Sequence, residues 1–434
     1  MFGKGHNGIH LKSCKNTAEA APVAIPVPER VTLTLATFRG CLNEPIVNVG
    51  DHVDVGQPIA PSGGGLSVSV HATVSGTVEA MDVGDNGKAS SVTIHSDGAQ
   101  TPWAGITPPT VTNLDELVAA VRESGLTGLG GAGFPTWVKL IKGPDILLLN
   151  GSECEPYCTA DYHLMCTDAA SILEGALLVR KFTGVKQIIV GIKSTNAKAL
   201  AAMNQAAAGM DAVEIKALEG FYPVGAEKMC IQQSTGRIVP RGKLPKDVGV
   251  TVLNVSTAAF IAQYLRTGMP LVSKTVTLDG AALKNPGLVV APIGTPICEL
   301  FAAAGGFTED PGKIIVGGPM MGGSVSSLNN PLLRQESCLL AFTEEQGKLP
   351  AENPCIRCGR CTRGCPMYLM PADMYRAREA RDGAELNALM VDLCIECGVC
   401  SYVCPAKINL VASHRQGKQI LRSYQAKNRR SDAK

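Results

Sequence analysis

Short apolar runs of strand length alternate with segments of helical period through the middle of the chain. Residues 146–150 and 187–192 are mainly apolar, which is typical of strands buried inside a parallel sheet. Helical spacing of apolar residues follows each run, at 169–181 and 197–208, and a further strand is expected at 212–217. This alternation of strands and helices predicts an α/β domain.

The segment before this domain has a different pattern. From residue 31 to residue 94, short runs alternate apolar and polar positions between glycines and an Asn86–Gly87 turn signal, so we expect a small all-β module. Its segments 49–60 and 71–78 resemble the barrel-sandwich modules of lipoyl and biotinyl carriers. Lys88 is the candidate for a modified carrier lysine, but a packing or docking role is the favoured interpretation.

Prolines 102, 108 and 109 mark a linker, and residues 113–122 then have helical spacing. A third pattern begins at residue 274, where two short strands around an Asp279–Gly280 turn precede a helix. We expect Thr295 to cap this helix and Pro296 to be its first residue.

Composition limits the possible functions. The chain has 434 residues, which exceeds the size of one hydrophobic core, so several domains are expected. Its formal net charge is only +2 and its aromatic content is 4%, which disfavours nucleic-acid binding. No window of about 18 apolar residues is present, so we expect no transmembrane segment. No secretory segment is expected at the N-terminus either, which favours a cytoplasmic protein.

Two cysteine runs near the C-terminus have the same spacing, C-x-x-C-x-x-C-x-x-x-C-P. They are Cys355, Cys358, Cys361 and Cys365, then Cys394, Cys397, Cys400 and Cys404. In such runs three thiolates bind one [4Fe-4S] cluster and the fourth cysteine binds the neighbouring cluster. We therefore expect two clusters, with the ligand sets Cys355, Cys358, Cys361 and Cys404, and Cys394, Cys397, Cys400 and Cys365.

Zinc sites and disulfides account less well for these cysteines. Structural zinc sites also use four thiolates, but zinc modules usually offer two C-x-x-C pairs for each ion. Disulfides are disfavoured in a reducing cytosol. The cysteines outside the runs lack tight ligand spacing, and a third cluster at Cys154, Cys158 and Cys166 is a minor alternative.

A glycine-rich loop and three strand-end loops form the second candidate site. The loop spans residues 128–139 and contains four glycines before a helix-compatible run, so its backbone and the amides at a helix start could approach a phosphate. Polar residues at 150–156 follow the strand expected at 146–150, and similar loops occur at 220–228 and 254–257. Ligands bind at such strand ends in open α/β sheets.

These four segments resemble the FMN and NADH site of the flavin subunit of respiratory complex I. With the N-terminal barrel and the cluster runs, the chain is more closely similar to the C subunits of Rnf complexes, the ion-translocating ferredoxin:NAD+ oxidoreductases. The resemblance implies noncovalent FMN, NAD(H) as substrate and no catalytic side chain, because the flavin carries the hydride. The residues implied around FMN are Gly128, Gly130, Gly131, Gly133, Lys139, Asn150, Ser152, Tyr222, Gly225, Asn254 and Thr257; those facing the nicotinamide nucleotide are Phe134, Glu155 and Glu227.

The sequence departs from the complex I pattern at three positions. Ser152, Ala226 and Leu253 stand where that family has aspartate, glutamate and asparagine, so individual flavin contacts differ. A helix N-terminal carboxylate is the structural alternative for Glu155. Two further functions stay open: a soluble flavin and iron-sulfur reductase of the cobalamin-reductase type, and an electron-relay scaffold without flavin.

The resemblance also implies a domain organisation. It is a multidomain α/β chain with a barrel-sandwich module at 1–108, a Rossmann-like FMN/NADH domain at 109–268, a β-grasp module and connecting strand at 269–345, and a helical ferredoxin-like domain with two [4Fe-4S] clusters and a basic tail at 346–434. The implied partners are the other Rnf subunits and, indirectly, ferredoxin. The implied location is peripheral, on the cytoplasmic face of the membrane. The tail, which includes Arg415, Lys418 and Lys434, is interpreted as a solvated basic helix.

Overall fold

A parallel four-stranded sheet forms the middle of the chain in the computed structural model, which describes residues 8–432. Its strands are β8 (Ile146–Asn150), β9 (Gln187–Lys193), β10 (Val213–Leu218) and β11 (Val250–Asn254), in the order β10-β9-β8-β11, and the expected strands are confirmed. The chain passes from β8 to β9 and β10 on one side, then returns to place β11 on the other side of β8. The loops after β8 and β11 therefore diverge, which creates a switch point at the carboxyl ends of these strands.

Helices cover both faces of this sheet. They are α1 (Leu114–Glu123), η1 (Thr136–Lys139), α2 (Ala160–Thr167), α3 (Ala169–Thr183), α4 (Ala197–Ala206), α5 (Glu227–Thr235), η2 (Pro245–Val248) and α6 (Val255–Thr267). Successive side chains of a strand point to opposite faces. Leu147 and Leu149 of β8 accordingly join a core with α3 and α6, whereas Ile146 and Leu148 join another with α5.

The N-terminal module is all-β, as expected. Its strands are β2 (Arg30–Thr34), β3 (His52–Val53), β4 (Pro58–Ala60), β5 (Val70–His71), β6 (Gly76–Val83) and β7 (Ala89–Ser96). Four of them form an antiparallel sheet in the order β2-β7-β6-β3, and β4 pairs with β5. Val31 and Ile94 of this module belong to the same buried core as Leu117 of α1, so the module and the α/β unit share one hydrophobic core.

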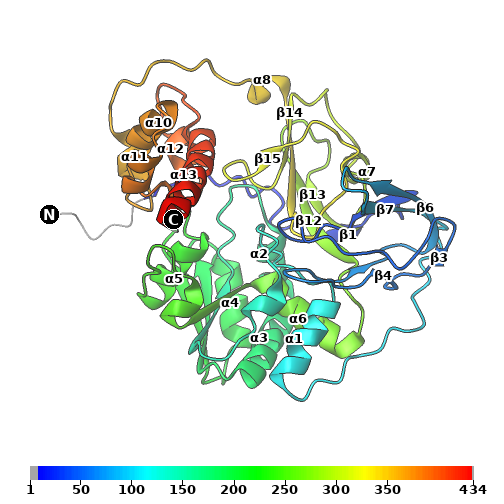
Figure 1. Ribbon diagram of the computed structural model, residues 1–434. Helices are drawn as coiled ribbons and strands as arrows, with labels where there is room; N and C mark the ends of the chain where they lie inside the picture. Colours follow the sequence, from blue (N-terminus) through cyan, green and yellow to red (C-terminus); the bar gives the residue numbers. More distant parts are fainter. Residues whose placement is uncertain (1–7, 433–434) are drawn as a thin grey trace.

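A six-stranded sheet follows the α/β unit (Figure 1). It contains β12 (Ser273–Asp279), β13 (Gly287–Pro292), β14 (Lys313–Val316), β15 (Gly323–Ser324) and β16 (Cys338–Phe342), with α7 (Ile297–Ala303) and α8 (Glu344–Gly347). Its sixth strand is β1 (Pro22–Ala24), which leaves the N-terminal arm and pairs in parallel with β13. The sequence did not predict this pairing.

The predicted start of α7 was one residue early. The helix begins at Ile297 with Pro296 as its N-cap. Thr295 cannot cap it because its hydroxyl donates to the carbonyl oxygen of Pro292 at 2.8 Å and so completes the preceding turn.

The C-terminal segment is a cluster of short helices closed by one long helix (Figure 1). These are α9 (Arg360–Gly364), α10 (Pro371–Glu379), α11 (Gly383–Ala388), η3 (Val391–Leu393), α12 (Val399–Tyr402) and α13 (Leu410–Asp432). Lys434, counted in the basic tail, lies outside the described residues. No helix between residues 8 and 432 is long and apolar enough to cross a lipid bilayer.

Candidate cofactor sites

The two cysteine runs have the same backbone conformation. Equivalent positions adopt left-handed φ angles: 53° and 56° at Arg357 and Glu396, 70° and 80° at Gly359 and Gly398, and 55° and 59° at Tyr368 and Lys407. In each run the glycine is the N-cap of a short helix, α9 in the first and α12 in the second. The runs are therefore a structural repeat, not only a repeat of spacing.

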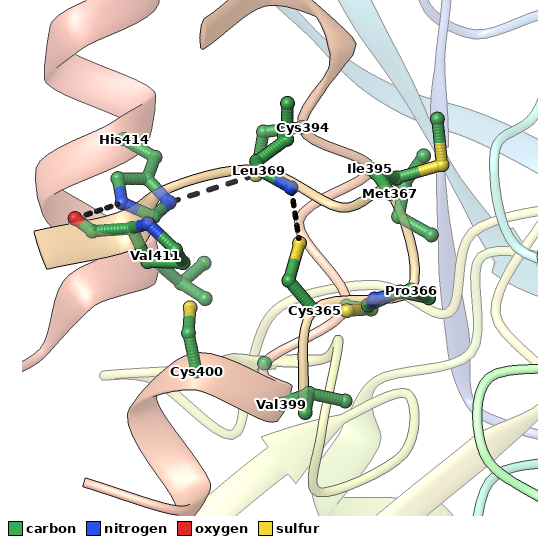
Figure 2. Close-up of a pocket in the computed structure, with 13 residues that line it drawn as sticks. Cys365, Pro366, Met367, Leu369, Cys394, Ile395, Val399, Cys400, Val411 and His414 are labelled. Carbon is green, nitrogen blue, oxygen red and sulfur yellow. Dashed lines mark hydrogen bonds between the residues drawn. The ribbon is translucent and has the colours of Figure 1, made fainter. Parts of the chain in front are cut away.

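Each run contributes its last cysteine to the other run's cavity. Cys394, Cys397, Cys400 and Cys365 line one cavity, which we call the inner cavity, and Cys355, Cys358, Cys361 and Cys404 line a second, the outer cavity. Figure 2 shows Cys365, Cys394 and Cys400 around the inner cavity. The grouping is the one expected for the two ligand sets. No three His, Cys, Asp or Glu side chains within residues 8–432 are placed to share a single metal ion.

The chemistry of the inner cavity fits a cationic group. Burial raises the pKa of the Cys397 thiol to about 12 and raises the pKa of Cys400 as well. These thiols therefore stay neutral unless a positive centre stabilises their thiolates, which is what bound iron does.

The two cavities differ in exposure. Cys365, Cys397 and Cys400 of the inner cavity are buried, whereas Cys355 and Cys358 of the outer cavity are exposed. The inner cavity also lies against the α/β unit. The Tyr222 hydroxyl donates to the carbonyl oxygen of Cys397 at 2.8 Å, and Met367 and Ile395 pack on the core that contains α5.

Several donors and acceptors surround the sulfur atoms of the inner cavity. The amides of Leu369 and Glu396 lie 3.4 Å from the Sγ atoms of Cys365 and Cys394, respectively. His414 Nε2 lies 3.1 Å from the carbonyl oxygen of Pro371 and Nδ1 lies 3.6 Å from Cys394 Sγ (Figure 2). Such contacts tune the reduction potential of a cluster. Sequence reasoning missed His414 because it lies on α13, 20 residues beyond Cys394.

The basic tail is not a purely solvated helix, because Lys418 is largely buried although the Arg415 side chain is half exposed. Arg415 and Lys418 on α13 both pair with the Glu396 carboxylate, at 2.8 and 2.6 Å. Lys418 also donates to the carbonyl oxygen of Cys394 at 2.7 Å. These cations therefore hold α13 against the second cysteine run.

The second candidate site lies at the switch point of the parallel sheet. Asn150 and Asn254 are direct partners at the ends of β8 and β11. The Asn254 side chain caps α6, accepting from the amides of Ser256 and Thr257 at 2.8 and 3.3 Å. The glycine loop crosses this point: the amide of Leu129 donates to Thr257 Oγ1 at 3.0 Å.

Close approach explains one of the glycines. A Cβ atom on Gly130 would lie 3.0 Å from Asn254 Nδ2, which is tighter than side chains normally pack. The helix expected after the loop is only the four-residue 3-10 turn η1. The expected helix is therefore shorter than the sequence predicted, because Leu140 already leaves helical geometry. The helix start beside the loop belongs to α6.

The rest of the glycine loop is open on one side. Among the described residues, a Cβ on Gly131 would meet no atom within 4 Å, whereas one on Gly133 would lie 3.4 Å from Gln335. Phe134 packs edge-on against Phe38 of the N-terminal module, with 5.2 Å between ring centroids. The amide of Gly128 donates to the Phe134 carbonyl oxygen at 2.7 Å and closes the loop.

Lys139, in the turn that follows this loop, forms an ion pair with Glu227. Lys139 Nζ lies 3.0 Å from Glu227 Oε1 and 3.0 Å from the carbonyl oxygen of Val252. Asn150 donates to the Gly225 carbonyl oxygen at 2.8 Å and accepts from the Ser152 amide at 3.2 Å. Ser152 itself is fully buried, and its hydroxyl donates to the carbonyl oxygen of Gly191 on β9 at 3.5 Å.

The alternative of a helix-capping carboxylate was assigned to the wrong glutamate. Glu155 accepts from the amides of Met320 and Met321 at 3.1 and 3.0 Å, so it holds the loop after β14, and burial raises its pKa. Glu153 is the carboxylate at the start of α2, where it accepts from the amides of Asp161 and Tyr162. Burial raises the pKa of Glu153 to about 7.

The residues expected around the flavin and the nicotinamide nucleotide thus lie in two places in the structure. Most of them gather at the switch point of the sheet: Gly128, Gly130, Asn150, Gly225, Asn254 and Thr257, with Lys139 and Glu227 beside them. Tyr222 and Glu155 lie farther toward the inner cavity, with 3.4 Å between the Tyr222 hydroxyl and Glu155 Oε1.

Four family profiles match the chain in order. They are the RnfC barrel sandwich hybrid domain at residues 4–99, the Nuo51 FMN-binding domain at 121–263, the SLBB domain at 275–323 and the 4Fe-4S dicluster domain at 350–405. These matches agree with the mixed α/β architecture that the sequence predicted.

Curated relatives cover most of the chain. The C subunit of the Na(+)-translocating ferredoxin:NAD(+) oxidoreductase complex of Acetobacterium woodii is 39% identical, over 89% of this chain and 90% of that protein. The C subunit of the proton-translocating complex of Clostridium ljungdahlii is 38% identical, over 86% and 84%. The C subunit of the ion-translocating oxidoreductase complex of Rhodobacter capsulatus is 36% identical, over 88% and 77%.

Among solved structures, a chain of an NAD+-reducing [NiFe]-hydrogenase in the H2-reduced state is similar. Its TM-score is 0.51 at 19% identity, covering 74% of this chain and 67% of that chain. This similarity is one of fold.

Proposed function

Because the chain belongs to the family of C subunits of ion-translocating ferredoxin:NAD(+) oxidoreductase complexes, we propose that it is the subunit through which such a complex exchanges electrons with NAD(H). It would hold FMN noncovalently at the glycine loop and one [4Fe-4S] cluster in each of the two cysteine cavities. Bound FMN takes up a hydride as two electrons, and iron-sulfur clusters carry electrons one at a time.

The chain's own residues would bind and position these groups. The glycine loop lets the backbone approach a phosphate, and Lys139 supplies a positive charge paired with Glu227. Asn150, Gly225 and Asn254 would complete the flavin site at the switch point. Ser152 and Tyr222, which the resemblance also implies, are buried and would support the site from within.

One observation carries this proposal. The inner cavity contacts the α/β unit that contains the flavin loops, whereas two cysteines of the outer cavity are exposed at the surface. Tyr222 follows β10 in the α/β unit and hydrogen-bonds to Cys397 of the inner set. Cys355 and Cys358 of the outer set are exposed. We therefore propose that the inner set serves the flavin side and the outer set serves the partner subunits.

The remaining features of the function follow from the family. The partners would be the other subunits of the complex and, through them, ferredoxin. The location would be peripheral, at the cytoplasmic face of the membrane. The four proposed domains are residues 1–108, 109–268, 269–345 and 346–434, although the first shares its core with the second and would not be removable without exposing apolar surface.

Two other functions make different predictions. A cobalamin-reductase type enzyme would share the flavin and cluster modules, but in that family the barrel follows the flavin loop, whereas here it precedes it. An electron-relay scaffold would keep the clusters and lack flavin. Ala226 and Leu253, at positions where complex I has polar residues, are what the scaffold alternative rests on.

The test uses full-length protein purified without oxygen. We expect about eight irons and eight labile sulfides per chain, stoichiometric FMN, bleaching of the flavin by NADH and turnover with an artificial acceptor. Stoichiometric zinc without labile sulfide would refute the cluster assignment. Absence of FMN would favour the scaffold, and flavin-loaded protein that does not react with NADH would contradict the proposed function.

A further inference from the structure

A cavity that borders the glycine loop lies where three distant segments meet. We call it the junction cavity. Its walls include Thr34 and Thr37 from the N-terminal module, Thr127 just before the glycine loop, and Arg334 and Gln335 before β16. The cavity measures about 50 Å³, whereas about 10–15 Å³ suffices for one water molecule. It therefore has room for several waters or for one small polyatomic ion.

Arg334 brings an uncompensated positive charge to this cavity. Its residue is 9% exposed, and burial lowers the pKa of its guanidinium to about 10. Within the part of the chain that the structure describes, the guanidinium has no hydrogen bond, ion pair or ring contact. A buried charge is costly unless a counter-charge and hydrogen bonds satisfy it.

The nearest acidic residue in sequence does not supply that counter-charge. Glu336 accepts from the amide of Leu333 at 2.8 Å and interacts with Lys274. Lys274 is itself buried and donates to the Arg334 carbonyl oxygen at 2.7 Å. The Glu336 carboxylate is thus engaged by the Leu333 amide and by Lys274, and it supplies no counter-charge to the Arg334 guanidinium.

A second group of this cavity also lacks a partner. Within residues 8–432 the Thr127 hydroxyl has no hydrogen-bond partner, and Thr127 is 2% exposed. A buried hydroxyl without a partner costs free energy. His71 on nearby β5 does not supply a negative charge. Burial and the Arg334 charge lower the pKa of its imidazole to about 3, so the ring stays neutral. Arg334 and Thr127, whose side-chain donors lack partners among residues 8–432, thus both line a cavity whose walls include no acidic residue.

We propose that the junction cavity binds one small free oxyanion of the phosphate and sulfate class, held by the Arg334 guanidinium with the Thr127 hydroxyl and the Gln335 amide as further donors. A guanidinium can donate two parallel hydrogen bonds to such an ion. The bound anion would satisfy the buried charge and join the N-terminal module, the glycine loop and the segment before β16 of the six-stranded sheet. This assignment does not depend on the proposed electron-transfer function.

The experiment uses full-length, flavin- and cluster-loaded protein in phosphate-free and sulfate-free buffer. Titration calorimetry with inorganic phosphate should give one site per chain, and phosphate should raise the melting temperature more than potassium chloride of equal ionic strength. Arg334→Gln should weaken phosphate binding at least about tenfold, because it removes the charge and the paired donors. Arg266→Gln, which removes an exposed arginine paired with Glu174, is the matched control and should bind normally.

Two further variants keep the test valid if Arg334→Gln disturbs folding. Thr127→Val preserves the shape and removes only the hydroxyl, so it should weaken phosphate binding without lowering stability in phosphate-free buffer. Arg334→Lys keeps the charge but loses the paired donors and should bind with intermediate affinity. In phosphate-free buffer Arg334→Gln should melt no lower than the wild type, because it removes an unpaired buried charge.

Three results would overturn the proposal. They are the absence of phosphate binding, phosphate affinity that is the same in Arg334→Gln as in the wild type, and displacement of phosphate by FMN or NADH in direct competition. The last result would mean that the site takes the phosphate of a nucleotide and not a free anion.

Discussion

The Tyr222 hydroxyl donates a hydrogen bond to the main-chain carbonyl oxygen of Cys397, across 2.8 Å and 175 positions of sequence. Tyr222 is 1% exposed and Cys397 is 7% exposed. The bond therefore links the loop after β10 to the second cysteine run in an interior that excludes water. It connects the two candidate cofactor sites through one side chain.

Tyr222→Phe should retain FMN and iron but lose about 1–3 kcal/mol of stability, because the buried Cys397 carbonyl would lose its partner. Thermal unfolding of anaerobic protein, with flavin and iron assays, measures both. Tyr402→Phe is the control, since Tyr402 is 60% exposed and its loss should have little effect. Unchanged stability of Tyr222→Phe would show that the bond contributes nothing.

Cysteine replacements should pair across the two runs and not within them. Cys365→Ala and Cys394→Ala should each empty the inner cavity and leave the same remaining cluster signal by electron paramagnetic resonance. Cys404→Ala and Cys355→Ala should each empty the outer cavity and leave the cluster signal of the inner cavity. Each variant should lose about four of the roughly eight irons expected.

Cys41→Ala, outside both runs and both cavities, is the control and should keep its full iron content. If Cys365→Ala instead gave the signal of Cys355→Ala, the crossed ligand sets would be wrong.

Gly131→Asp should abolish flavin binding and leave iron unchanged. The added carboxylate would enter the open side of the glycine loop and repel a phosphate, at a backbone φ of +118° that favours glycine. Gly143→Asp has a similar φ of +112° and equally open surroundings, so it controls for backbone strain. Flavin absorbance and iron content are measured in both. Equal flavin loss in the two variants would mean that strain, and not the site, is responsible.

Lys274 should make stability rise with pH. Burial lowers its pKa to about 7, whereas an unfolded lysine titrates near 10.4. Between these values the unfolded chain binds one more proton than the folded chain, so the free energy of unfolding should increase by about 1.4 kcal/mol per pH unit. This gain is lost as the pH falls to about 7, where folded Lys274 becomes charged.

The measurement is the stability difference between wild type and Lys274→Met, by denaturant unfolding across this pH range. The difference should shift in favour of the wild type as the pH rises. Lys198→Met removes an exposed lysine and should give a flat difference. A flat difference for Lys274→Met as well would contradict the lowered pKa.

Local signals in the sequence determined much of this protein. The strands β8 and β9 follow from apolar runs of strand length, and the repeated cysteine spacing was sufficient to predict which four thiols share each cavity. The polar residues at strand ends predicted the switch-point site, because parallel strands bring their carboxyl ends to one edge. These predictions succeed because spacing and periodicity act over a few residues.

Only the tertiary structure decided which groups are buried together. The inner and outer cavities have identical spacing, and their difference in exposure comes from packing of one run against the α/β unit. Glu153 and Glu155 are two residues apart, yet one caps α2 and the other holds the loop at Met320. The unpaired Arg334 depends likewise on distant neighbours. Burial, and the cost of leaving a charge or hydroxyl without a partner, is set by contacts between segments far apart in the chain, which sequence spacing alone does not encode.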